Sequence, residues 1–118
     1  MIAAMIISSI AVAQNYVAPE PNERQMKEAK ELTQKMDDEL SLTEEQILRA
    51  EQVNGEFMAR RDLIIGRRDL PFQERNELLA AMYIEQGNEL SDVLVRYQIK
   101  KFKKVRGRLQ PLVVLRRD

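Results

Sequence analysis

Apolar residues recur at spacings of three and four over most of this chain of 118 residues, which is the periodicity of amphipathic helices. The first helix is predicted from about Asn22 to Leu40, with Asn22 as its N-cap. Ser41 marks the break that follows it. The apolar stripe of this helix consists of Met26, Ala29, Thr33, Met36 and Leu40.

The sharpest local signal is the hexapeptide Leu42-Thr43-Glu44-Glu45-Gln46-Ile47. Thr43 can accept a hydrogen bond from the N–H of Gln46, whose side chain can reach back to the N–H of Thr43, and together they close a capping box. Leu42 and Ile47 stand where a hydrophobic staple needs apolar partners. A second helix is therefore predicted to start at Glu44, after a tight corner, and to end near Arg67 or Arg68. Its expected stripe is Ile47, Ala50, Val53, Phe57 and Ile64.

A third helix is predicted after the corner Asp69-Leu70-Pro71, with Pro71 at its first helical position. We expect it to continue through Gly87-Asn88, because apolar spacing resumes beyond them. Its candidate core residues are Phe72, Leu78, Leu79, Met82, Tyr83, Leu90 and Leu94.

A fourth helix is predicted from Arg96 to Arg106 and is expected to end at Gly107. Residues 107–118 are expected to form a flexible tail. The apolar run within the tail, residues 112–115, fits a short strand, a docking peptide or a disordered end.

These elements predict an all-α fold, an open helical hairpin arrangement of three long helices plus a short fourth. The apolar stripes are narrow, and a single layer of such helices buries little surface. We therefore expect a homodimer that completes the core.

The chain contains no cysteine and no histidine, which excludes thiolate chemistry and removes both the commonest zinc ligand and the usual general base. Its net charge is zero, but the charges are unevenly distributed. Acidic residues prevail between residues 20 and 56, whereas from Arg96 onward Asp118 is the only acid. Such a basic end attracts nucleic acid, anionic lipid or acidic protein surfaces, or is simply a solvated helix face.

The first 13 residues, MIAAMIISSIAVA, are apolar and uncharged, and they are too short to span a bilayer. Ala11-Val12-Ala13 is an A-x-A site, so residues 1–13 resemble a secretory signal peptide cleaved after Ala13. No Lys or Arg precedes the apolar stretch. A short buried helix or a membrane anchor is the alternative. Residues 14–22, with Pro19 and Pro21, are expected to form a flexible linker.

Leu42-Thr43-Glu44-Glu45-Gln46 matches the LTxxQ motif of the Spy/CpxP family of periplasmic proteins. A second copy lies at Leu94-Val95-Arg96-Tyr97-Gln98, where Val95 replaces the threonine. The resemblance covers roughly residues 24–106, so that 23–106 is interpreted as an LTxxQ-type helical domain. Its motif residues shape helix corners and are Leu42, Thr43, Gln46, Leu94 and Gln98.

The resemblance implies a periplasmic helical protein related to envelope stress. Better-known members of the family form curved dimers, and at least one is an ATP-independent chaperone. Some relatives bind zinc or other metals through histidine, which this chain lacks. Because Val95 has no cap oxygen, whether the third and fourth helices are separate or merge is left open.

The residues themselves favour binding to unfolded or envelope proteins, since methionine surfaces adapt to varied partners and arginines bind carboxylates. The alternative is that the methionines fill the core and the arginines are solvated. A regulatory protein that binds one envelope sensor or structural partner is the second hypothesis. The candidate partner-binding residues are Met58, Arg60, Arg61, Arg67, Arg68, Lys100, Lys101 and Lys104.

Catalysis is not expected. Ser41 and Ser91 have no His or Cys companion, acidic pairs fall at exposed or capping positions, and no Gly-rich phosphate loop occurs. No cofactor and no metal site are predicted. Nucleic-acid binding by the basic last helix is disfavoured if the protein is exported, and contact with a membrane surface is a further alternative.

Overall fold

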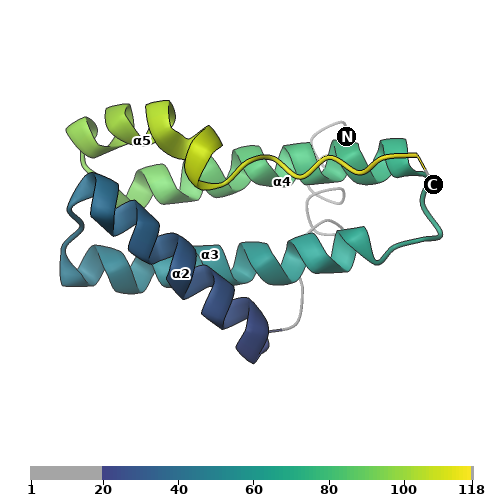
Figure 1. Cartoon of the computed structure of the whole chain (residues 1–118), viewed down its shortest axis with the longest axis horizontal. Coiled ribbons are helices and arrows are strands. Elements are labelled where there is room, and N and C mark those ends of the chain that lie inside the picture. The colour runs from purple at the N-terminus through teal and green to yellow at the C-terminus, as the bar shows by residue number, and fades with distance from the viewer. Residues whose placement is uncertain (1–19, 118) are drawn as a thin grey trace, which may run out of the picture.

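A computed structural model describes residues 20–117, which form four helices joined by short corners (Figure 1). The all-α class predicted from the sequence is confirmed, and no strand occurs between residues 20 and 117. The helices are α2 (Glu23–Leu40), α3 (Glu44–Ile65), α4 (Phe72–Val93) and α5 (Arg96–Leu109).

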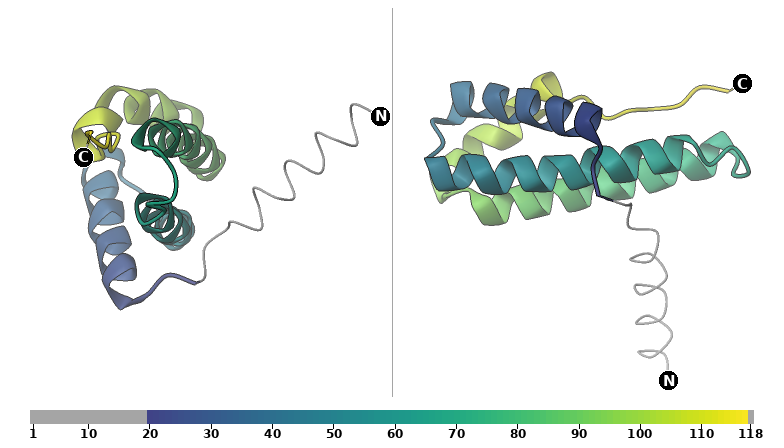
Figure 2. Two further views of the ribbon diagram at one scale, coloured as in Figure 1. Left: turned by 90° about the vertical axis from the view of Figure 1, so that its right-hand side faces the viewer. Right: turned by 90° about the horizontal axis from the view of Figure 1, so that it is seen from below.

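Helices α3 and α4 run antiparallel and side by side, joined by the turn of residues 66–71 (Figures 1 and 2). Helix α2 crosses α3 at a slant, and α5 packs against α2 (Figure 2). Both α2 and α5 lie toward the end where α3 begins and α4 ends. The opposite end of the α3–α4 pair, near the turn, is covered by neither of them (Figure 1).

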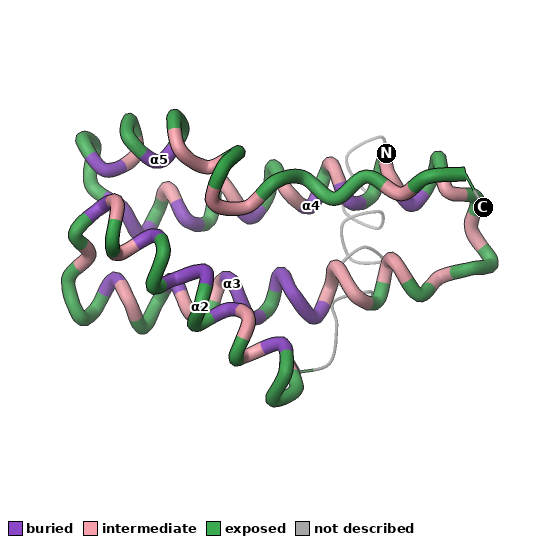
Figure 3. Tube along the Cα trace, viewed as in Figure 1, coloured by how far each residue is buried: buried purple, intermediate pink, exposed green. Residues whose placement is uncertain are grey.

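The core lies where the inward faces of the four helices meet (Figure 3). Leu90 is fully buried, and Met36 and Leu79 are almost fully buried. Truncating a buried leucine such as Leu90 to alanine costs about 2 to 5 kcal/mol, because contacts are lost and a cavity remains. The buried cluster consists of Ala29, Leu32, Met36, Leu40, Ala50, Phe57, Met58, Leu79, Met82, Leu90, Leu94 and Phe102.

The first two helices begin at the residues that the sequence predicts. The Asn22 side chain accepts a hydrogen bond from the N–H of Gln25, whose own side chain accepts one from the N–H of Asn22. Thr43 and Gln46 form the same reciprocal pair at the start of α3. Ser41, between the two helices, takes the left-handed conformation with φ 54°, which ends α2 and turns the chain sharply.

Several predicted helix boundaries were wrong. Helix α3 ends at Ile65, before the predicted Arg67 or Arg68. Pro71 is the N-cap of α4 and precedes its first helical residue, Phe72. Helix α4 does continue through its central glycine, as predicted.

The predicted end of the last helix was also wrong. Helix α5 passes through Gly107 and ends at Leu109, because Gly107 adopts no left-handed conformation that would break it. Its C-cap is Gln110, whose N–H donates to the carbonyl of Arg106. In place of a tail that starts at residue 107, residues 111–117 run extended alongside α4 (Figure 1).

The proposed signal peptide, residues 1–13 with cleavage after Ala13, lies outside the described residues, as does most of the linker at 14–22. Within residues 20–117, no helix combines the length and apolar character that a membrane crossing requires. Pro21, at the end of the linker, lies beside α3: a Cβ added at Gly55 would meet its ring at 3.3 Å.

Candidate functional site

The two motif copies meet in the folded protein through their glutamines. Gln46 Nε2 donates to Gln98 Oε1 at 2.8 Å, and Gln98 Nε2 donates to Gln46 Oε1 at 3.1 Å. Both side chains are buried. The start of α3 is thereby tied to the start of α5, although 52 residues separate the two glutamines in the sequence.

Each glutamine also satisfies main-chain groups at the helix corners. Gln46 Oε1 accepts from the N–H of Thr43 at 2.9 Å, and Gln46 Nε2 donates to the carbonyl of Val93 at 3.1 Å. Gln98 Oε1 accepts from the N–H of Val95 at 3.0 Å, and Gln98 Nε2 donates to the carbonyl of Leu40 at 3.2 Å. Buried main-chain groups left unpaired are costly, so these amides fix where two helices end, α2 and α4, and where two begin, α3 and α5.

The second motif copy lacks half of the capping arrangement. Thr43 Oγ1 accepts from the N–H of Gln46 at 3.1 Å, whereas the Val95 side chain has no oxygen to offer Gln98. The corner nevertheless forms, because Gln98 bonds the N–H of Val95 and Leu94 is buried at the same place. Helices α4 and α5 are therefore separate, and the motif residues build a structural corner.

A series of buried hydrogen bonds between polar side chains, which the sequence analysis missed, links all four helices. Asn54 Nδ2 donates to Thr33 Oγ1 at 2.9 Å, and Gln86 Nε2 donates to Asn54 Oδ1 at 3.0 Å. Arg106 Nη2 donates to Gln86 Oε1 at 2.8 Å. The sequence feature that could have revealed this network is an amide side chain within the apolar stripe of a helix, at residues 54 and 86.

Arg106 is the charged end of this network. Its guanidinium lies 3.5 Å from the centre of the Tyr83 ring and also donates to the Tyr83 carbonyl. Burial lowers the pKa of Arg106, and within residues 20–117 the side chain makes no ion pair. A Cβ added at Gly87 would lie 2.6 Å from Arg106 Nη1, which explains a glycine in the middle of α4.

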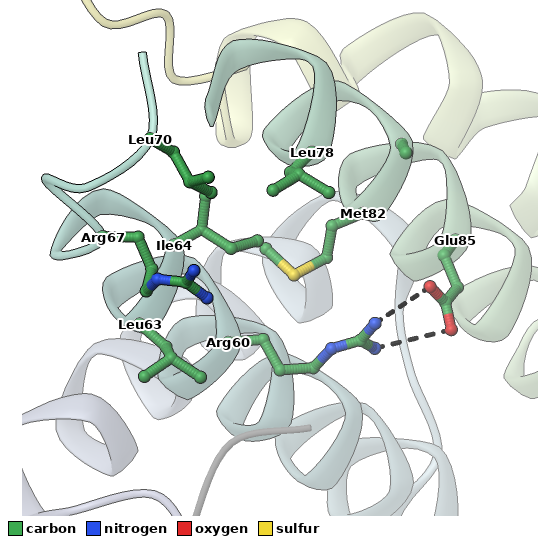
Figure 4. Close-up of a pocket in the computed structure, with 9 residues that line it drawn as sticks. Arg60, Leu63, Ile64, Arg67, Leu70, Leu78, Met82 and Glu85 are labelled. Carbon is green, nitrogen blue, oxygen red and sulfur yellow. Dashed lines mark hydrogen bonds and ion pairs between the residues drawn. The ribbon is translucent and has the colours of Figure 1, made fainter. Parts of the chain in front are cut away.

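An apolar groove opens between α3 and α4 at the end that α2 and α5 leave uncovered (Figure 4). We call it the α3–α4 groove. Its volume is about 300 Å³. Leu63 and Leu78, on opposite walls, remain 38% and 45% exposed. The groove is lined by Arg60, Leu63, Ile64, Arg67, Leu70, Leu78, Ala81, Met82 and Glu85.

Charged groups flank this apolar surface. Arg60 Nη2 pairs with Glu85 Oε2 at 3.0 Å across the groove (Figure 4). Arg67 Nη2 pairs with Asp69 Oδ2 at 2.7 Å. The hydrogen bond from Arg67 holds the pKa of Asp69 below its usual value. Burial and the neighbouring carboxylate of Glu85 raise the pKa of Glu89. The groove therefore combines an aliphatic floor with arginines whose present partners are partly exposed carboxylates.

Only two of the candidate partner-binding residues, Arg60 and Arg67, line this groove. Met58 is 2% exposed and belongs to the core, so its prediction as a binding residue was wrong. Arg61 points to α2, where Glu28 holds it in an ion pair at 2.5 Å. Asp62, beside it on α3, forms a second ion pair at 2.9 Å. It is therefore engaged within the fold, because one carboxylate lies on α2 and the other beside it on α3.

The remaining candidates lie at two separate places. Arg68 is exposed in the turn before α4. Lys100, Lys101 and Lys104 are exposed on α5, toward the other end of the molecule (Figure 1). Lys101 Nζ lies 3.9 Å from a carboxylate oxygen of Glu39. The predicted bases thus do not form one surface.

Comparison of the chain with protein-family models, with curated proteins and with solved structures found no match. The likeness to the Spy/CpxP family therefore stays a resemblance carried by the motif residues. Between residues 20 and 117, no three or more Asp and Glu side chains are grouped so as to hold a metal ion. What the described surface offers chemically is apolar contact flanked by charge.

Proposed function

We propose that this protein binds other polypeptides in a chaperone-like way, and that apolar segments of its clients enter the α3–α4 groove. The observation that carries the proposal is an aliphatic groove of about 300 Å³ with exposed Leu63 and Leu78 on its walls. Exposed apolar patches rimmed by polar residues commonly mark protein-binding sites. Unfolded polypeptides display such apolar segments, whereas folded ones bury them.

The arginines at the groove extend the proposal to mixed apolar and acidic segments. Arg60 and Arg67 each pair with a carboxylate that is more than half exposed, so water and other solutes have access to both pairs. A client carboxylate can replace Glu85 or Asp69 and keep the arginine in a charge-assisted hydrogen bond. Clients of this kind are apolar segments that carry one or two acidic residues.

The periplasm is the proposed compartment, and envelope stress the proposed setting. Support comes from the A-x-A site at residues 11–13 and from the LTxxQ resemblance.

We also propose that two copies of the open hairpin associate as a homodimer. Large apolar side chains that stay exposed outside the groove favour this: Leu48, Ile84 and Tyr97 are 67%, 63% and 70% exposed. Light scattering coupled to size-exclusion chromatography tests the dimer, and a monomer at tens of micromolar would contradict it.

An aggregation assay tests the function. A chemically denatured client is diluted into buffer with and without the protein, and light scattering is followed. The wild type is expected to suppress scattering, and Leu78→Glu to lose most of this effect, because it places a charge on the groove wall. Gln52→Glu is the matched control, since Gln52 is exposed on α3 outside the groove. Equal suppression by both variants, or none by the wild type, would refute the proposal.

A regulatory role toward one envelope partner is the second candidate. It is favoured by the basic surface of α5, where Lys100, Lys103 and Lys104 are exposed and make no ion pair with any residue from 20 to 117. Such a surface suits an acidic partner. Pull-down from envelope extracts separates the two roles: one stoichiometric partner, lost on Lys103→Glu, supports regulation, and many substoichiometric partners support client binding.

A further inference from the structure

The chain's C-terminal segment, residues 110–117, lies along α4 in an extended conformation and is held by its main chain (Figures 1 and 2). Asn76 Nδ2 donates to the carbonyl of Leu115 at 2.9 Å, and the N–H of Leu115 donates to Asn76 Oδ1 at 2.7 Å. Tyr83 Oη donates to the carbonyl of Gln110 at 2.6 Å. Two α4 side chains, two helical turns apart, therefore form hydrogen bonds with three main-chain groups of one extended segment.

These hydrogen bonds do not depend on which side chains the segment carries, because they are made with its main chain. A side-chain amide that bonds both the N–H and the carbonyl of one residue replaces the partner strand that an extended peptide normally needs. The apolar side chains of the segment contribute little in comparison. Leu112, Val113 and Val114 remain 41%, 37% and 63% exposed, and only Leu115 packs against the core.

The segment also forms one wall of a hollow of about 380 Å³ on the side of the molecule that α2 occupies. The hollow has no lining residue in common with the α3–α4 groove. Leu32, on α2, and Leu112 and Val113, on the segment, lie among the residues that line it. Glu28, Glu31 and Lys35 of α2 line it as well. A segment seated along α4 thus has room beside it for side chains larger than those now present, next to both apolar and charged groups.

We propose that the face of α4 between Asn76 and Tyr83 is a peptide-binding site that recognises main-chain groups, and that the chain's own segment 110–117 occupies it in the free protein. The occupant that replaces this segment is an extended apolar stretch of another polypeptide. Any such strand offers the same N–H and carbonyl groups to Asn76. The inference rests on the contacts of the C-terminal segment alone and does not depend on the α3–α4 groove.

Tethering explains why the site is filled yet exchangeable. A segment joined to α5 by a single corner is present at a high effective concentration, so it occupies the site through a few weak contacts. The buried cluster itself includes no residue beyond Phe102, and of the segment only Leu115 packs against it. Departure of the segment therefore uncovers one edge of the core and leaves the contacts between the helices in place. An incoming peptide must therefore bind this face of α4 more tightly than the tethered segment does in order to replace it.

The test uses full-length protein and a fluorescein-labelled synthetic peptide with the sequence of residues 110–118, followed by fluorescence anisotropy. Leu115→Pro removes the N–H that bonds Asn76 and should release the tethered segment. The labelled peptide is expected to bind this variant about tenfold more tightly than the wild type, since a net hydrogen bond corresponds to about a two- to tenfold change. Val114→Pro is the matched control, because the N–H of Val114 makes no hydrogen bond with residues 20–117.

The site itself is tested in the Leu115→Pro background. Adding Asn76→Ala should abolish the gain in peptide affinity, whereas Gln73→Ala, at an exposed position on the same helix, should preserve it. Circular dichroism confirms that each variant keeps its helices. Leu78→Glu, in the groove, should leave peptide affinity unchanged, which separates this site from the proposed client groove.

Three results would overturn the proposal. Equal peptide affinity of the wild type and Leu115→Pro would show that the tethered segment does not occupy the site. Peptide binding that survives Asn76→Ala would place it elsewhere. A halving of the molar mass on Leu115→Pro in light scattering would show that the segment seated in the site comes from a second copy. The site would then serve self-association and not the binding of another polypeptide.

Discussion

The damaged motif copy offers a direct test of how the helix corners are specified. Val95 occupies the N-cap of α5 with φ −90° and ψ 167°, close to the φ −75° and ψ 165° of Thr43 at the N-cap of α3. Gln98 already bonds the N–H of Val95. Val95→Thr therefore adds the one missing element, a hydroxyl oxygen that can accept from the N–H of Gln98.

The expected gain is about 1 kcal/mol in the free energy of unfolding, because Ser, Thr, Asp and Asn caps are each worth about 0.5 to 2 kcal/mol over apolar residues. Val95 is 49% exposed, so the hydroxyl also keeps access to water and little packing is lost. For a folded unit of this size, the same gain raises the midpoint of thermal unfolding by about 4 to 8 °C. Urea unfolding followed by circular dichroism measures it.

The reverse substitution supplies the control. Thr43→Val removes the equivalent oxygen from α3 and should cost about 1 kcal/mol. The double variant, which exchanges the two caps, should return to about wild-type stability, because the two substitutions act at separate N-caps. Val95→Thr that leaves the stability unchanged or lowers it, while Thr43→Val destabilises, would refute the equivalence of the two corners.

Three further predictions concern substitutions in the helices and the dependence of stability on pH in the acid range. Each is measured by chemical or thermal unfolding. Gln98→Met should cost about 3 kcal/mol, because Gln46 loses its two hydrogen bonds to Gln98 and two main-chain groups lose a buried partner; a loss below about 1 kcal/mol would contradict the role of the glutamine pair. Gly87→Ala should destabilise, since its Cβ would lie 2.6 Å from Arg106, whereas Gly107→Ala meets nothing within 4 Å and should gain up to about 1 kcal/mol. Burial alone would raise the pKa of Asp62, but hydrogen bonds from Gln25, Arg24 and Arg61 outweigh it and lower that pKa. The stability that Asp62 contributes is therefore present above its unfolded pKa of about 3.9 and is lost as the pH falls through the folded pKa, so Asp62→Asn should flatten the stability profile below about pH 4.

Local chemistry allowed the helices and two of their starts to be predicted from the sequence. Helical periodicity and the caps at Asn22 and Thr43 depend on neighbours within four residues, so a single sequence contains the information. Pro71 and Gly107 misled the prediction of helix ends by one to three residues, since proline and glycine permit a boundary without requiring one.

The functional surface was less predictable, because it depends on which helix faces which. Arg60 and Arg61 are adjacent in sequence, yet one lines the groove and the other is locked against α2. Met58 was expected to contact partners and instead fills the core, as a helix of this period equally permits. The approach of Gln46 to Gln98 across 52 residues was likewise invisible locally, although the repeated motif marked both residues.

The most direct test of the central claim, client binding in the α3–α4 groove, is a nuclear magnetic resonance titration. Isotope-labelled protein is mixed with increasing amounts of an unlabelled, permanently unfolded client, and backbone amide shifts are followed. We predict saturable changes centred on Leu63, Leu70 and Leu78, with little change around Gln46 and Gln98 at the motif corner. Saturation that leaves the groove amides unchanged, or that moves mainly the amides of α5, would contradict the account.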